Sequence, residues 1–141
     1  MGFYEDYSAV FNQVKTTLEN VTSLKQVALG ERFTIKSLPL AIINAGDTSI
    51  SDAKIGGGLL ELRIGFDVIV VIKETEPEDW FEDIISVMGD VMDALITDRT
   101  LGGTVKALYP TRFTPGEIRF QNRIYYGGLL SFEALKLWSP A

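Results

Sequence analysis

Two side chains on which most enzymes depend are missing from this chain. The sequence contains no cysteine and no histidine. Without cysteine there is no disulfide framework, no thiol nucleophile and no cysteine-ligated zinc. Without histidine the chain lacks the commonest general base and metal ligand, so Ser-His and Cys-His arrangements are excluded. The composition therefore favours a binding or structural role over an enzyme.

Long apolar runs and an excess of positive charge are missing as well. The longest uninterrupted apolar run, Val68–Ile72, is far shorter than the ~20 residues of a membrane helix, so we expect no membrane partner. Lys and Arg total 13 against 19 Asp and Glu, which gives a net charge of -6. This balance argues against a tightly bound nucleic acid, because such binding depends on neutralised phosphates. What remains is an ordinary globular composition, and its length predicts a single domain over residues 1–141.

Apolar residues at three- and four-residue steps predict two helices. In residues 4–21 they form one stripe, made of Tyr7, Val10, Phe11, Val14, Leu18 and Val21. The second helix is expected over Pro77–Ile96, with a capping box of Thr75 and Glu78 at its start. Gly102–Gly103 follows and ends it. Its broad apolar face comprises Trp80, Phe81, Ile84, Ile85, Met88, Val91, Met92 and Leu95.

The remaining segments indicate strands and loops. Leu60–Lys73 alternates over its whole length and places Leu60, Leu62, Ile64, Phe66, Val68, Val70 and Ile72 on one face. Shorter strands are expected at 24–29, at 38–43 (with Pro39 at a strand start or an edge), at 105–109, at 118–126 and at 129–137. A loop is expected at 44–58 and a turn at 114–117. Whether residues 117–137 form a hairpin or one bent strand is left open.

The order helix, strands, helix, strands predicts an α+β fold with a mainly antiparallel sheet packed against two helices. The second helix should cover the apolar face of the 60–73 strand. Replacing Phe66 or Ile84 by Ala should then cost about 2–5 kcal/mol.

Residue patterns that could carry chemistry are weak. The Gly56–Gly58 run leads into a strand and lacks the lysine of a phosphate loop. The carboxylates at 74–83 lack calcium-loop spacing and are explained by the dipole of a helix start. Base and aromatic residues interleave at 119–126, as in some RNA-binding strands, but a solvent or interface face is favoured. We predict no catalytic, cofactor or metal residues, and expect neither turnover nor an obligatory cofactor.

The segment from Asp98 to Val105 resembles the helix-to-strand junction of tail terminator (tail-completion) proteins of long-tailed bacteriophages. The residues that match this junction are Asp98, Thr100, Leu101, Gly102 and Gly103. The order of expected helices and strands is similar over nearly the whole chain, although the 44–58 segment has no family pattern. A helix that ends in Leu-Gly-Gly is also a common helix terminus, whatever the family.

The resemblance implies a non-enzymatic virion structural protein. It would form a homo-oligomeric, probably hexameric, ring on the head-proximal end of the tail tube, after assembly in the host cytoplasm. Its partners would be other copies of itself, the tail tube protein and the head connector or neck protein, with DNA only passing through. The alternatives are another virion neck component, a cellular oligomeric binding module of the same layout, or an enzyme that uses carboxylates or a metal.

Two surfaces are candidates for contacts in such an assembly. The first is the expected loop, where partner contacts are predicted for Asp47, Ser51, Asp52, Lys54, Gly56 and Gly57. The second is a subunit interface with Ile69, Val71, Arg119, Arg123 and Tyr125. Ile69 and Val71 lie on the strand face opposite the core, so the N-terminal helix or a neighbouring subunit must cover them. The resemblance favours the neighbour.

Overall fold

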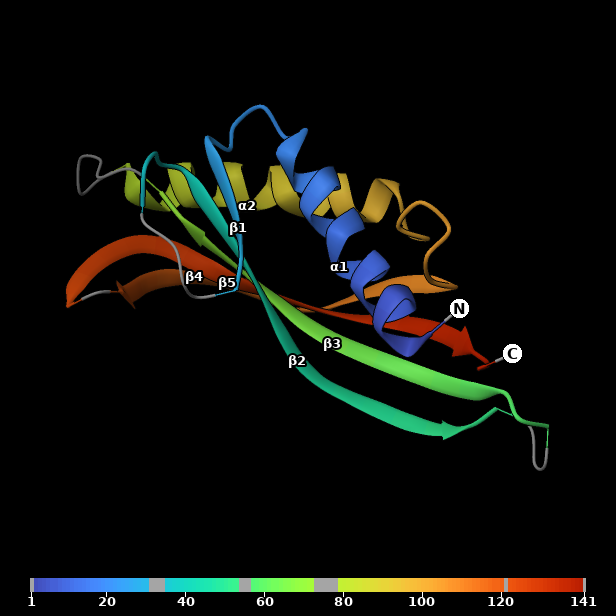
Figure 1. Cartoon of the computed structure of the whole chain (residues 1–141). Coiled ribbons are helices and arrows are strands. Elements are labelled where there is room, and N and C mark those ends of the chain that lie inside the picture. Colours follow the sequence, from blue (N-terminus) through green and yellow to red (C-terminus); the bar gives the residue numbers. More distant parts are fainter. Residues whose placement is uncertain (1, 31–34, 54–56, 73–78, 121, 141) are drawn as a thin grey trace.

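Over the residues that the structure describes, two helices lie on one side of a twisted five-stranded sheet (Figure 1). The structure is a computed structural model, and it describes residues 2–30, 35–53, 57–72, 79–120 and 122–140. In chain order the elements are α1 (Phe3–Glu19), β1 (Gln26–Leu29), β2 (Leu40–Asp52), β3 (Leu60–Val71), α2 (Trp80–Thr97), β4 (Ala107–Phe120) and β5 (Arg123–Trp138). Neither described helix is long and apolar enough to cross a membrane.

The sheet has the strand order β1-β2-β3-β5-β4. Only β1 and β2 pair in parallel, and the three other pairings are antiparallel. This confirms the α+β class and the mainly antiparallel sheet. Because β1 covers only the first four residues of β2, the second half of β2 is paired with β3 alone. We call this second half of β2, together with the first half of β3, the β2–β3 ribbon; it extends beyond the end of β1 in Figure 1.

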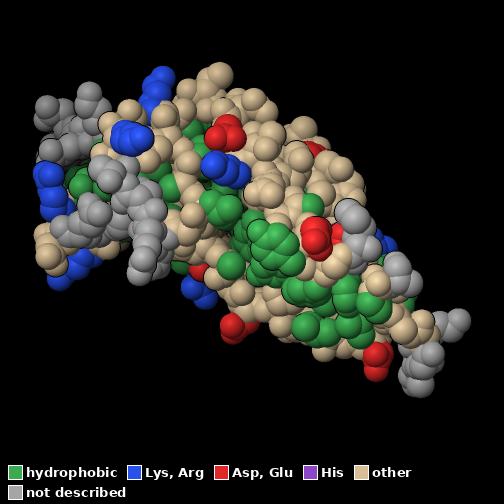
Figure 2. Space-filling model, viewed as in Figure 1, with side chains coloured by type: hydrophobic (Ala, Val, Ile, Leu, Met, Phe, Trp, Pro, Cys, Tyr) green, Lys and Arg blue, Asp and Glu red, His purple; other side chains and the backbone are tan. Residues whose placement is uncertain are grey.

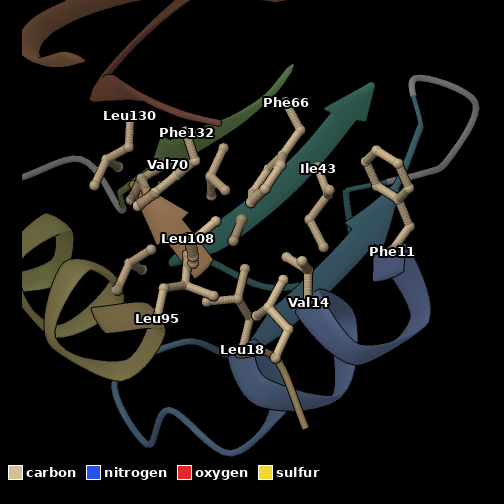
Figure 3. Packing of buried hydrophobic residues seen from close by; sticks show 14 of the residues in the cluster. Phe11, Val14, Leu18, Ile43, Phe66, Val70, Leu95, Leu108, Leu130 and Phe132 are labelled. Atoms are coloured by element: carbon tan, nitrogen blue, oxygen red, sulfur yellow. The ribbon is translucent and has the colours of Figure 1, made fainter. Parts of the chain in front are cut away.

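The main core lies between the sheet and the two helices. As the alternation in the sequence predicts, β3 contributes Leu62, Ile64, Phe66, Val68 and Val70 to this core. Phe66 is central: its ring lies 5.8 Å from that of Phe11 on α1 and 5.3 Å from that of Phe132 on β5. Figure 3 shows these side chains together with Val14, Leu18 and Leu95 from the helices. The same cluster includes Ile84, Met88 and Val91 of α2.

Two expected loops are strands instead. Residues 44–52 were expected in a loop, but β2 runs on to Asp52 and pairs with β3 throughout, with an irregularity between Ala45 and Thr48. The local composition is polar because this half of β2 lies in the exposed ribbon, not because it is a loop. The expected turn at 114–117 lies inside β4, where Pro115 is tolerated because β4 is the outermost strand.

The open question about residues 117–137 is answered by a hairpin between β4 and β5. Its turn contains Asn122 in a left-handed conformation with φ 62°. Beyond this turn β5 is one continuous strand that passes through Gly127–Gly128. The helix of residues 4–21 is confirmed as α1, and the second helix is described from Trp80 onward. The expected capping box of Thr75 and Glu78 lies outside the described residues.

A second, smaller hydrophobic cluster lies on the opposite face of the sheet. Its buried members are Ala28, Leu40, Ile42 and Val71. Ile35, Leu38, Ile69, Ile118 and Tyr125 are partly buried against it. The expectation that α1 or a neighbouring subunit must cover Val71 is therefore wrong. The segment before β2 and the β4–β5 hairpin of the same chain bury it.

Candidate functional site

The junction that carries the family resemblance forms a tight, hydrogen-bonded turn after α2. Asp98 directs it, because its carboxylate Oδ2 accepts a hydrogen bond of 2.8 Å from the backbone N–H of Gly102. The other oxygen, Oδ1, lies 3.4 Å from the hydroxyl of Thr100. The backbone N–H of Leu101 donates to the carbonyl oxygen of Asp98 at 3.0 Å, and that of Gly103 donates to Thr100 at 3.0 Å.

Three consecutive residues of the junction adopt left-handed backbone conformations. Their φ angles are 47° for Leu101, 65° for Gly102 and 85° for Gly103. Glycine adopts such angles without strain, whereas leucine does not. The Leu101 side chain is 0% exposed, so its burial in the main core offsets that strain. The residue types of the motif thus follow from one task, which is to reverse the chain between α2 and β4.

This geometry predicts the effect of removing the Asp98 carboxylate. Asp98→Ala should lower the free energy of unfolding by about 1 kcal/mol, because the N–H of Gly102 loses its partner at an exposed site. Asp93→Ala is the matched control, since Asp93 is exposed near the end of the same helix and should cost less than about 0.5 kcal/mol. Urea denaturation of both variants measures the difference. Equal losses would contradict the role assigned to the Asp98 carboxylate.

The residues of the predicted partner-contact loop are placed on the β2–β3 ribbon. Asp47, Ser51 and Asp52 are exposed residues of β2, and Gly57 is exposed in the following bend. Lys54 and Gly56 lie outside the described residues. The strand irregularity brings the carbonyl oxygen of Asp47 close to Gly65 of β3, where an added Cβ would lie 3.0 Å from it. Partner contact by these residues stays a prediction, but they belong to a strand pair and not to a free loop.

The sheet face opposite the helices carries a row of polar contacts. On this face Arg63 forms ion pairs of 3.2 Å with both Glu61 and Glu133. The hydrogen bond to Glu133 and the charge of Glu61 raise the pKa of the Arg63 guanidinium. Nearby, the hydroxyl of Ser131 donates to Asp67 at 2.7 Å. In Figure 1 both helices lie on the other side, so this face is uncovered by any described helix.

The predicted subunit-interface residues fall into two groups. Arg119 and Arg123 are exposed on the β4–β5 hairpin, and the Arg123 guanidinium lies 5.8 Å from the ring centre of Tyr125. Tyr125 and Ile69 are half-buried against the second cluster. Val71 has no exposed surface, so it cannot contribute a side chain to an interface. For the other four residues the interface stays a prediction.

An exposed aromatic surface, which we call the end patch, was missed by sequence reasoning. It lies where the start of α1 meets the β2–β3 ribbon and the end of β5. Its exposed members are Phe3, Tyr4 and Ile50, and Leu60 and Trp138 are half-buried beside them. Figure 2 shows hydrophobic side chains gathered over this end of the molecule. The signal was present in the alternation of Thr48, Ile50 and Asp52, but these residues were assigned to a loop.

The described carboxylates and one surface depression are the remaining places where a site could lie. None of these described carboxylates come together in a group of three or more that could hold a metal ion. An open depression of about 500 Å³ between the helices is lined by Gln13, Thr17, Asn20, Val21, Asp93, Ala94, Thr97 and Asp98. All of these are exposed or half-exposed, so the depression offers a wet surface and not a desolvated pocket.

Comparison with known proteins identifies a structural likeness but no sequence family. No protein-family model matches the sequence, and no curated protein is similar to it. Among solved structures, the chain is similar to the sheath/tube terminator of an extracellular contractile injection system, PVC, in its extended state. The two share 18% sequence identity with a TM-score of 0.44, over 93% of this chain and 55% of the other. The chain therefore spans about half the length of that protein.

Proposed function

We propose that this chain is a tail terminator subunit, which caps the head-proximal end of a phage tail tube, stops its polymerisation and offers the head-joining surface. The observation that carries the proposal is the junction at Asp98–Gly103. Each of its matched residues has a specific structural task, from the Asp98 carboxylate on Gly102 to the buried left-handed Leu101. An ordinary glycine terminus of a helix needs neither of these two features.

The proposed role is structural and not enzymatic. Assembly through surfaces needs no histidine, cysteine, metal or cofactor, and the sequence contains neither histidine nor cysteine. The native mass spectrum of the purified chain should accordingly show the bare polypeptide mass or its multiples. A nucleotide or metal retained in every copy would contradict this part of the proposal.

The proposed assembly is a homo-oligomeric, hexameric ring. A ring forms when one surface of a subunit binds a different surface of the next and the rotation closes. The chain has two such different surfaces at its two ends, the end patch and the β4–β5 hairpin. The exposed ribbon residues Asp47, Ser51 and Gly57 are proposed to meet the tube or the head connector. The net charge of -6 would let DNA pass without sticking.

A tube-growth assay tests the proposed function. Purified chain added to elongating tail tubes should stop their growth at a stoichiometry of one ring per tube end, because a cap occupies the site of the next tube subunit. The tube length distribution, measured by electron microscopy, should narrow and shorten as protein is added. A neck component of another kind would bind without shortening the tubes, and unchanged lengths would contradict the terminator proposal.

A further inference from the structure

We infer that the tip of the β4–β5 hairpin of one copy docks on the end patch of a second copy. The hairpin tip is defined by residues 118–120 of β4 and 122–126 of the turn and β5, and it lies at the end of the molecule opposite the end patch (Figure 1). This inference rests on the proposed function, for which it names the two surfaces that meet between neighbouring subunits.

The end patch is an aromatic surface flanked by carboxylates. Asp52, Leu60 and Trp138 are direct neighbours across β2, β3 and β5, so their side chains share one face of the sheet. The indole N–H of Trp138 donates to the carboxylate of Asp6 at 2.9 Å, and the ring of Phe3 meets that of Trp138 edge-on at 5.3 Å. Leu60 and Trp138 therefore lie between two carboxylates, that of Asp52 on one side and that of Asp6 on the other.

The rest of the patch is unusually exposed for apolar side chains. Tyr4 is 77% exposed and Ile50 is 57% exposed. The carboxylate of Glu5 adds a further exposed negative charge beside Tyr4. Aromatic faces ringed by carboxylates suit a partner that brings guanidinium groups and a small apolar side chain, because arginine binds both aromatic rings and carboxylates.

The hairpin tip carries that complementary chemistry. Between residues 118 and 126 the sequence has two arginines and no carboxylate. Ile124, which is 59% exposed, is the direct cross-strand neighbour of Arg119. Arg123 precedes it in the chain and is exposed as well. The exposed Glu117 pairs with Tyr126 at the base of the hairpin tip, and Trp80 at the acidic start of α2 stacks on the same Tyr126 at 5.3 Å. The basic character therefore belongs to the outer part of the tip, which carries Arg119 and Arg123.

The partner must be another copy, because one chain cannot bring its tip onto its own patch. A single strand, β5, begins at Arg123 in the tip and ends at Trp138 in the patch. Its 16 residues span roughly 50 Å when extended. Figure 2 shows Lys and Arg side chains at the tip end, and Asp and Glu beside the apolar surface at the other. A contact between unlike ends continues from copy to copy, as a ring requires.

Charge reversal tests this docking with the full chain. In sedimentation velocity over a range of protein concentrations, Arg119→Glu with Arg123→Glu should raise the apparent dissociation constant for self-association at least about tenfold, because like charges then face each other. Lys25→Glu with Lys106→Glu makes the same change in net charge at exposed positions outside both surfaces. That control should associate as the wild type does, and all variants should keep the wild-type circular dichroism.

A compensating variant makes the test specific to the two surfaces. Adding Glu5→Arg and Asp52→Arg to the tip reversal should restore association, whereas these two changes alone should weaken it. A wild-type chain that stays monomeric at all concentrations, or tip variants that associate normally, would overturn the docking. Patch variants that self-associate normally but no longer bind tubes would show that the end patch contacts the tube and not a second copy. That result would also overturn the docking. The tube-growth assay decides the terminator proposal separately.

Discussion

Replacing Phe66 by Ala should lower the free energy of unfolding by about 3–5 kcal/mol, which is one of the two largest effects we expect. Phe66 is 1% exposed, and its ring lies between Phe11 of α1 and Phe132 of β5. Truncation removes the contact that joins the first helix to the centre of the sheet and leaves a cavity that neighbouring rings cannot fill. Urea or guanidinium denaturation, followed by circular dichroism, measures the loss.

Phe81→Ala is the matched control for this prediction. Phe81 has the same side chain, but it is 53% exposed in the first turn of α2, so its loss should cost less than about 1 kcal/mol. Ile84→Ala, one turn further on and fully buried, should cost about 2–5 kcal/mol. If Phe66→Ala cost no more than Phe81→Ala, the packing of the core between α1, β3 and β5 would be wrong.

Replacing Gly127 by Ala should destabilise the chain by about 3 kcal/mol or more, at the upper end of what overpacking costs. A Cβ at Gly127 would overlap the carbonyl oxygen of Val70 on β3 and lie 2.9 Å from Cδ1 of Ile118. The oxygen belongs to the backbone of a central strand and cannot move aside as a flexible side chain can. The substitution should therefore separate β5 from β3 next to the second cluster.

The neighbouring strand supplies a control for the glycine substitution. Gly116 is the direct cross-strand partner of Gly127 on β4, and an added Cβ there meets nothing within 4 Å. Gly116→Ala should leave stability unchanged or raise it slightly, because alanine reduces the entropy of the unfolded chain. Thermal unfolding of the two variants side by side distinguishes them. A Gly127→Ala variant as stable as Gly116→Ala would contradict the close approach of β5 to β3.

Long periodic segments were predictable from the sequence. The alternation in β3 placed Leu62 through Val70 on the core face, and the three- and four-residue steps in α1 and α2 identified the helical faces that bury them. In both cases one face is almost wholly apolar, so the two-residue period of a strand or the 3.6-residue period of a helix is visible without knowing which element packs against it. The α+β class followed from the order of these elements.

Other strands were not predictable in the same way, because backbone pairing determines their structure and local composition does not. The second half of β2 is polar apart from Ile50 and contains Gly46, yet backbone pairing with β3 makes it a strand. In β4, Pro115 suggested a turn, but an edge strand loses no ladder hydrogen bond at a proline that faces outward. Burial of Val71 depends on residues 35–38 and on the hairpin, which are distant in sequence.

Of the candidate site, the junction at Asp98–Gly103 was found from sequence because its residues are contiguous and glycine marks its left-handed turn. Arg119 and Arg123 were also found, since they alternate with aromatic residues. The end patch was not found from the sequence, because it brings together the start of α1, the end of β2, the start of β3 and the last residue of β5. Such a surface exists only once the strand register is known.

The most direct test of the proposed terminator role is imaging of tail tubes grown with the purified chain. Cryo-electron microscopy should show one closed ring of this chain at one end of each tube, with the β4–β5 hairpin of each copy on the end patch of the next. A chain that coats tubes along their length, or that leaves both tube ends bare while tubes keep growing, would contradict the account.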